Sequence, residues 1–98
     1  MFTKSNTERG FGLVKFKDYY DCDCNIQHSS LATEECIWLG VQDAEPQIMA
    51  SNTKEGGVGW VPYDIPKEVL LNTRMHITRK QSFKLAKVLL KFALTGKL

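Results

Sequence analysis

The sequence lacks the long apolar runs that mark secreted and membrane proteins. Residues 1–12 contain no apolar core of a secretory signal, and no later stretch approaches the roughly 18 consecutive apolar residues of a membrane span. Cysteine is also scarce, because the chain has 3 cysteines, an odd number without the spacing of a disulfide framework. We therefore expect a protein that stays in a reducing cytoplasm and does not enter a membrane.

Acidic residues are absent from one end of the chain. Residues 69–98 carry seven bases and no acid, whereas residues 18–68 carry ten acids against two lysines, a net charge of −8. Residues 1–17 add a net +3, and the whole chain has a formal net charge of +2. This asymmetry indicates either an anionic partner or attraction between the basic and acidic parts of the chain itself.

The length and composition predict one small folded domain. A chain of 98 residues can form one hydrophobic core and is short for two. With 43% hydrophobic and 24% charged residues, it lies in the ordinary globular range and outside that of disordered chains. We expect a single domain over residues 1–98, in which residues 1–10 can stay disordered.

Alternating apolar and polar residues predict a small antiparallel sheet of about five strands. The segments with this pattern are residues 12–17, 22–27, 35–41, 47–50, 60–63 and 69–77. The first two are expected to form a hairpin around the turn 18–21, and the glycine-rich stretch 51–59 is expected to be a loop. Trp38, in the most apolar segment, is interpreted as a core residue.

Residues 78–95 carry the pattern of a C-terminal helix, so the predicted class is α+β with the sheet packed against this helix. Thr78 and Gln81 have the spacing of a capping box, and Gly96 stands where a left-handed C-cap belongs. One side of the helix is apolar and is expected to cover the sheet. Further apolar residues widen this side enough to suggest deep burial or a partner subunit, namely Phe83, Leu90 and Leu94. The opposite side is a lysine stripe, interpreted as a solvated face or a nucleic-acid contact: Lys80, Lys84, Lys87 and Lys91.

A row of polar side chains precedes the helix. Alternation places Asn72, Arg74 and His76 on one strand face, where their donors and acceptors could bind an anion or simply meet water. The helix then begins with Arg79 and Lys80, cations at the positive end of a helix dipole. Such a start favours a bound phosphate, and equally it could be balanced by an acid of the same chain.

Three further residues are candidates for contact with a ligand. Ser29 and Ser30 lie in a polar connection and can contact a phosphate or form local turns, and Trp60 could stack on a base. The spacing of Cys22, Cys24 and His28 does not match a metal-ligand motif. No catalytic residue, cofactor or metal is predicted. The predicted ligand-binding residues are thus Arg74, His76, Arg79, Asn72, Ser29, Ser30 and Trp60.

Four sequence blocks, in order SSLAT, IWLG, TRMHITRKQ and the closing TGKL, resemble a family of small bacteriophage proteins. The likeness covers most of the chain from Phe11 onward. The family commonly ends in TGEL and has a glutamate in the first turn of the helix, where this chain has Lys97 and Lys80. The departures affect any anion site built on these two lysines and leave Arg74, His76 and Arg79 untouched.

The resemblance implies a phage-encoded protein in the cytoplasm of an infected bacterium. By analogy with other small phage proteins, it implies a non-catalytic role against host defence. One hypothesis is the sequestering of a small phosphorylated, nucleotide-type signal by a protein that can be a homo-oligomer. The alternatives are an inhibitor that binds a host defence protein complex, as anti-CRISPR proteins do, and an interaction module without a ligand.

Overall fold

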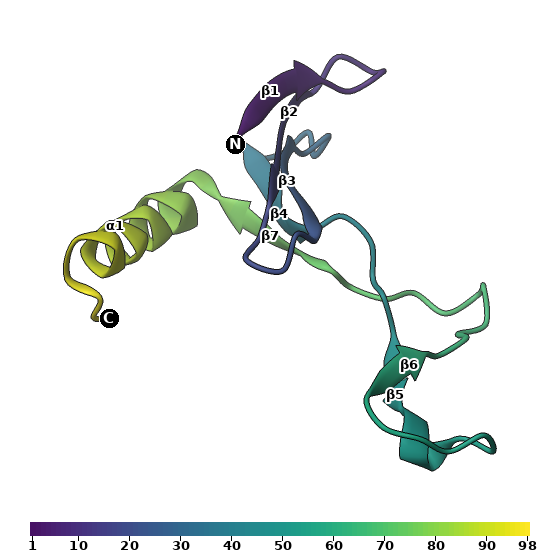
Figure 1. The fold of residues 1–98 in the computed structure, drawn as a ribbon. Coiled ribbons are helices and arrows are strands. Elements are labelled where there is room, and N and C mark those ends of the chain that lie inside the picture. The colour runs from purple at the N-terminus through teal and green to yellow at the C-terminus, as the bar shows by residue number, and fades with distance from the viewer. The chain divides into compact units, whose positions relative to one another are not determined.

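The computed structural model describes residues 1–98 and shows an α+β fold. The chain forms two compact units, one of residues 1–42 and 74–98 and one of residues 43–73. The first contains a five-stranded sheet and the C-terminal helix, and the second contains a two-stranded sheet (Figure 1). The predicted fold class is confirmed. We describe the units separately, and the single domain expected from the sequence stays a prediction.

The main sheet is antiparallel throughout, with the strand order β1-β2-β3-β4-β7. Its strands are β1 (Thr3–Asn6), β2 (Gly12–Lys17), β3 (Asp23–His28), β4 (Cys36–Val41) and β7 (Arg74–Thr78). The hairpin of β2 and β3 is confirmed, as is the position of β4 inside the sheet. β7 is shorter than its pattern predicts, because only residues 74–78 pair with β4.

Strand β1 lies in the segment that the sequence analysis expects to be disordered. It pairs with β2 from Thr3 opposite Lys15 to Asn6 opposite Gly12, and all four of its residues are exposed. The turn between the strands closes with a hydrogen bond from Gly10 N to the Thr7 carbonyl at 2.9 Å, and Gly10 has a φ of 86°. Backbone pairing therefore holds a strand whose polar side chains give no alternating signal.

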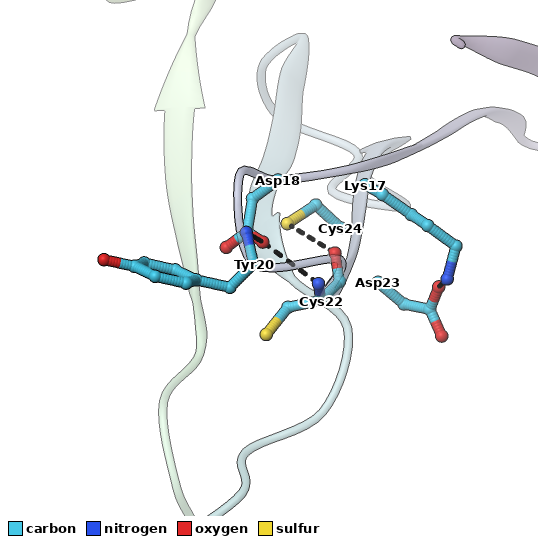
Figure 2. A network of polar contacts seen from close by, with 6 residues as sticks. All are labelled: Lys17, Asp18, Tyr20, Cys22, Asp23 and Cys24. Atoms are coloured by element: carbon cyan, nitrogen blue, oxygen red, sulfur yellow. Dashed lines mark hydrogen bonds and ion pairs between the residues drawn. The ribbon is translucent and has the colours of Figure 1, made fainter.

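The predicted turn at residues 18–21 is confirmed and is built around one carboxylate (Figure 2). Asp18 Oδ1 accepts hydrogen bonds from the backbone N–H groups of Tyr20 at 2.8 Å and Cys22 at 3.0 Å. Beyond the turn, Lys17 Nζ donates to Asp23 Oδ1 at 3.0 Å, and this contact raises the pKa of Lys17. Polar contacts within the hairpin thus stabilise its turn and the ends of its strands.

The two faces of the main sheet differ in polarity. Cross-strand partners share a face and neighbours along a strand alternate, so the register defines both sets. One face, called here the apolar face, carries one polar side chain of β3, His28, among apolar ones: Val14, Phe16, Cys24, Ile26, Ile37, Leu39, Val41, Met75 and Ile77. The other, the polar face, carries Leu13, Lys15, Lys17, Asp23, Asn25, Gln27, Cys36, Trp38, Arg74, His76 and Thr78. The position of Trp38 differs from the sequence-based interpretation, which treats it as a core residue.

Helix α1 (Arg79–Thr95) begins one residue after the predicted start, since Thr78 is its N-cap, and it ends at the predicted residue with both predicted caps. Thr78 Oγ1 accepts from Gln81 N at 3.1 Å, Gln81 Oε1 accepts from Thr78 N at 2.9 Å, and Gly96 is left-handed with φ 73°. The helix buries none of its residues, so the expectation that its apolar side covers the sheet is wrong for this chain taken singly. It is neither long nor apolar enough to cross a membrane.

The second unit pairs β5 (Gln47–Met49) with β6 (Trp60–Pro62), joined through a short 3-10 helix, η1 (Ala50–Asn52), and a loop. The sequence pattern correctly predicts these strands, but the expectation that they extend the main sheet is wrong. Ala50 is buried in this unit, and its N–H donates to the Gly59 carbonyl at 2.9 Å. Alternation alone cannot distinguish strands of one sheet from strands of two.

Candidate ligand-binding site

A cluster on the polar face joins three of the predicted site residues, Arg74, His76 and Ser29. Its centre is the cross-strand pair of Trp38 on β4 and His76 on β7, whose rings stack with centroids 4.0 Å apart and an angle of 15°. His76 Nε2 lies 2.9 Å from Ser29 Oγ, within hydrogen-bonding distance. The stack and the hydrogen bond together fix the orientation of the imidazole ring.

Arg74 extends the cluster along β7 and is anchored on β3. Its Nη1 donates to Asn25 Oδ1 at 3.1 Å and to Gln27 Oε1 at 3.0 Å, and its guanidinium carbon lies 5.5 Å from the centre of the Trp38 ring. These contacts are possible because β3 places Asn25 and Gln27 on the same face as Arg74, two strands away. Nη2 and Nε make no hydrogen bond and remain available as donors.

The charge of Arg74 has no carboxylate partner. The ion pairs of the chain are those of Lys17 with Asp23 and of His28 with Glu35, and neither involves the cluster. Amide oxygens satisfy hydrogen-bonding capacity without cancelling charge. The cluster therefore presents a positioned, uncompensated cation on the polar face.

Two buried polar residues support the cluster. Asn25 is 5% exposed and Ser29 is 8% exposed, and they are the buried polar residues of the chain. Ser29 Oγ also accepts from Leu31 N at 3.1 Å, and Ser29 N donates to the Cys36 carbonyl at 2.9 Å. Because a buried polar group is destabilising unless it is hydrogen-bonded, these contacts favour one fixed arrangement of Arg74 and His76.

A hollow of about 340 Å³ adjoins the cluster and includes Ser30, the fourth predicted residue. Gln27 and Trp38, which also contact Arg74, line it. The turn between β1 and β2 contributes further lining residues: Thr7, Glu8, Arg9 and Phe11. The Arg9 guanidinium lies 5.6 Å from the centre of the Phe11 ring, so this part of the hollow combines a cation with an aromatic surface.

Three predicted residues do not join the cluster. Asn72 and Trp60 belong to the second unit and are exposed. Arg79 lines a different hollow of about 520 Å³, together with Ile37, Ile77 and Phe83. Neither Arg79 nor Lys80 forms an ion pair, and the first turn of α1 contains no acid.

Four residues of the cluster and the hollow are not predicted from the sequence, namely Asn25, Gln27, Trp38 and Arg9. Along β3, polar and apolar residues alternate, so Asn25 and Gln27 lie on the other face of the strand from Cys24 and Ile26. This alternation is the signal from which Asn25 and Gln27 could have been predicted. Trp38 and Arg9 depend on the register of β4 and on the pairing of β1, and no residue pattern specifies either one.

The cysteines and histidines outside the cluster do not form a metal site. Cys24 and Cys36 are buried, and His28 Nε2 lies 2.6 Å from Glu35 Oε2. Burial, and then Glu34 and Glu35, raise the pKa of the Cys36 thiol, so it stays protonated to higher pH than an exposed thiol. No group of three or more His, Cys, Asp or Glu side chains is placed to hold a metal ion.

Comparisons of the chain with protein-family models, with curated proteins and with solved structures found no match. The contacts of the polar-face cluster are therefore the basis for proposing a function.

Proposed function

We propose that the chain is a non-catalytic binding protein for a small phosphorylated ligand of the nucleotide type, held by the polar-face cluster and the adjoining hollow. The observation that carries the proposal is Arg74, a cation fixed by two amide oxygens, with free donors and no acid beside it. A guanidinium matches the paired oxygens of a phosphate, and fixing it beforehand lowers the entropy lost on binding.

The surroundings of Arg74 suit the remainder of a nucleotide. Phe11 and Trp38 give the hollow aromatic surface for a base, while Ser30 and Gln27 offer polar atoms for its edge or for a sugar. Arg9 adds a second cation, and Glu8 is the acid among the lining residues. A volume of about 340 Å³ lies at the lower end of the range of about 300–1,000 Å³ for small-molecule sites.

The pair of Ser29 and His76 has the spacing of a nucleophile and its base, but its environment favours a structural role. Ser29 is 8% exposed, and its hydroxyl already accepts a hydrogen bond from Leu31 N. No carboxylate orients His76 from its other ring nitrogen, as nucleophile–base pairs generally require. These features support binding without catalysis.

From the sequence resemblance to bacteriophage proteins, itself a prediction, we infer that this binding takes place in an infected bacterium, where the protein would sequester a nucleotide signal of host defence. The alternative, an inhibitor that binds a host defence protein complex, stays a prediction. No contact of the polar-face cluster favours it over a small ligand.

Isothermal titration calorimetry against a panel of linear and cyclic nucleotides tests the proposal. We expect one class of nucleotide to bind, and we expect Arg74→Gln to weaken that binding about 10- to 100-fold, the equivalent of the ~1.5–3 kcal/mol of a charged hydrogen bond. Arg74→Lys keeps the charge but loses the planar fork, and should also bind more weakly.

Lys15→Gln is the matched control, because Lys15 is an exposed cation of the same face without a hydrogen bond or an ion pair. It should bind nearly as the native chain does. Circular dichroism should show that all three variants keep their fold. Lack of heat and of thermal stabilisation with every nucleotide, or equal weakening by Lys15→Gln and Arg74→Gln, would contradict the proposal.

A further inference from the structure

Helix α1 is apolar around most of its circumference, yet its side chains are exposed. Phe83 is 68% exposed, Leu90 is 60% exposed and Leu94 is 76% exposed, and the other side of the helix adds Val88, Leu89 and Phe92. At 100° per residue the four stripe lysines cover only a narrow sector, and the remaining circumference is mainly apolar. A helix with this pattern is normally buried against other elements.

The junction between β7 and α1 prevents the helix from covering its own sheet. β7 ends at Thr78 and α1 begins at Arg79, with no residue between them. Strands and helices that pack on each other are usually joined by loops of about 2–6 residues, which reverse the chain direction. Here the capping box at Thr78 and Gln81 fixes the helix start at the strand end instead.

The apolar face of the main sheet is equally uncovered. Ile26, Ile37 and Leu39 are only half-buried although they lie on inner strands, and Met75 is exposed. Two hollows open on this side, one of about 280 Å³ lined by Val14, Ile26 and Ile37, and one of about 520 Å³ at the first turn of α1. The chain thus has an apolar sheet face and an apolar helix that do not cover each other.

We propose that the occupant of the apolar sheet face is helix α1 of another copy of this chain. Six apolar side chains of the helix are about half exposed or more. A buried aromatic side chain covers ~150–250 Å², so we take ~100 Å² of exposed area for each of the six. Together they present on the order of 600 Å² of apolar surface. This approaches the ~800 Å² per partner of a standard interface, before the sheet residues around it are counted.

Charge complementarity favours this occupant. The helix carries five cations and no acid, while residues 1–42, which contain four strands of the sheet, carry six acids against four cations. A helix placed on the sheet of another copy would bury its apolar side and leave its lysine stripe free to meet those acids. Both surfaces are present in every copy, so an exchange of helices between copies would cover the apolar side of each helix and the apolar face of each sheet.

Sedimentation velocity and light scattering of the purified chain test the inference. We expect a mass of two or more copies of the 11.1 kDa chain. Leu90→Glu places a charge in the interface and should lower the association constant at least 100-fold. The control is Lys91→Gln, at the next residue, which belongs to the lysine stripe; it should change the association constant less than about threefold. A native protein that sediments as a single 11.1 kDa species at 100 μM, in about 0.15 M salt, would overturn the proposal.

A cross-linking measurement keeps the test valid if Leu90→Glu fails to fold. The photoreactive substitution Leu90→p-benzoylphenylalanine would be made in unlabelled chain and mixed with isotopically labelled native chain. We expect cross-links between unlabelled and labelled copies, mapping to Val14, Ile26 or Ile37. Cross-links that stay within one copy, or that join helix to helix without reaching the sheet, would contradict the proposed packing of α1 on the sheet of another copy.

Discussion

At the scale of single residues, the polar-face cluster depends on amide and hydroxyl groups that hold two recognition groups, the half-buried Arg74 and the exposed His76. Asn25 and Gln27 accept from one nitrogen of Arg74, and Ser29 contacts His76. Asn25 and Ser29 are buried, and thus more buried than the Arg74 and His76 side chains that they contact. This arrangement fixes the recognition groups while leaving them open to a ligand.

Asn25→Ala should destabilise the fold by about 1–3 kcal/mol, because it removes a buried acceptor and leaves one bond of the Arg74 Nη1 group unmade. Gln27→Ala is the matched control: its oxygen accepts from the same nitrogen, but it is only half-buried. We expect the control to lose less than half as much. Urea denaturation at one fixed protein concentration would measure both, and equal losses would contradict a special role for Asn25.

The sequence predicts only some residues of this cluster. Alternation around residue 75 correctly groups Arg74 with His76, because side chains two apart share a face whatever the strand pairs with. Trp38 is misassigned because an apolar segment gives no sign of which face its largest residue occupies. Asn72 and Arg79 are grouped with Arg74 by sequence position, and Trp60 is added as an aromatic that could stack on a base. The cluster is instead assembled by register across β3, β4 and β7.

At the scale of elements, the junction of β7 and α1 determines what the helix can contact. The helix itself is fully predictable from the sequence, since its caps and its lysine stripe are local signals. Its exposure is not predictable in this way. Covering a sheet requires a connection long enough to turn back, and the chain has no such residues between Thr78 and Arg79.

Thr78→Ala should destabilise the helix start by about 0.5–2 kcal/mol, because the Gln81 N–H loses its acceptor. Thermal unfolding followed by circular dichroism at 222 nm would measure the change. Thr95→Ala is the control, since Thr95 also accepts a backbone N–H, from Lys97, but at the C-terminal end of the helix. If the two substitutions shift the melting temperature equally, the capping box does not fix the junction.

At the scale of the whole molecule, the sequence predicts the α+β class and most strand positions, but not the division of strands between sheets. β5 and β6 alternate like strands of the main sheet, and their pairing with each other is set by the loop between them. β1 escapes prediction for the opposite reason, because its side chains are all polar and exposed. Which strands pair depends on the loops that connect them, and the residue pattern of a strand does not by itself predict its partner.

The central claim is that a phosphorylated ligand binds beside Arg74 and Trp38. The chain contains 2 tryptophans, Trp38 in the cluster and Trp60 in the second unit, so their indole N–H signals provide a probe and an internal control. In a nitrogen-15 NMR titration with a nucleotide that gives heat in calorimetry, we predict that the Trp38 indole and the Arg74 Nε–H signals shift with saturation while the Trp60 indole stays in place. A shift confined to Trp60, or saturable binding that leaves Trp38 and Arg74 unchanged, would contradict the account.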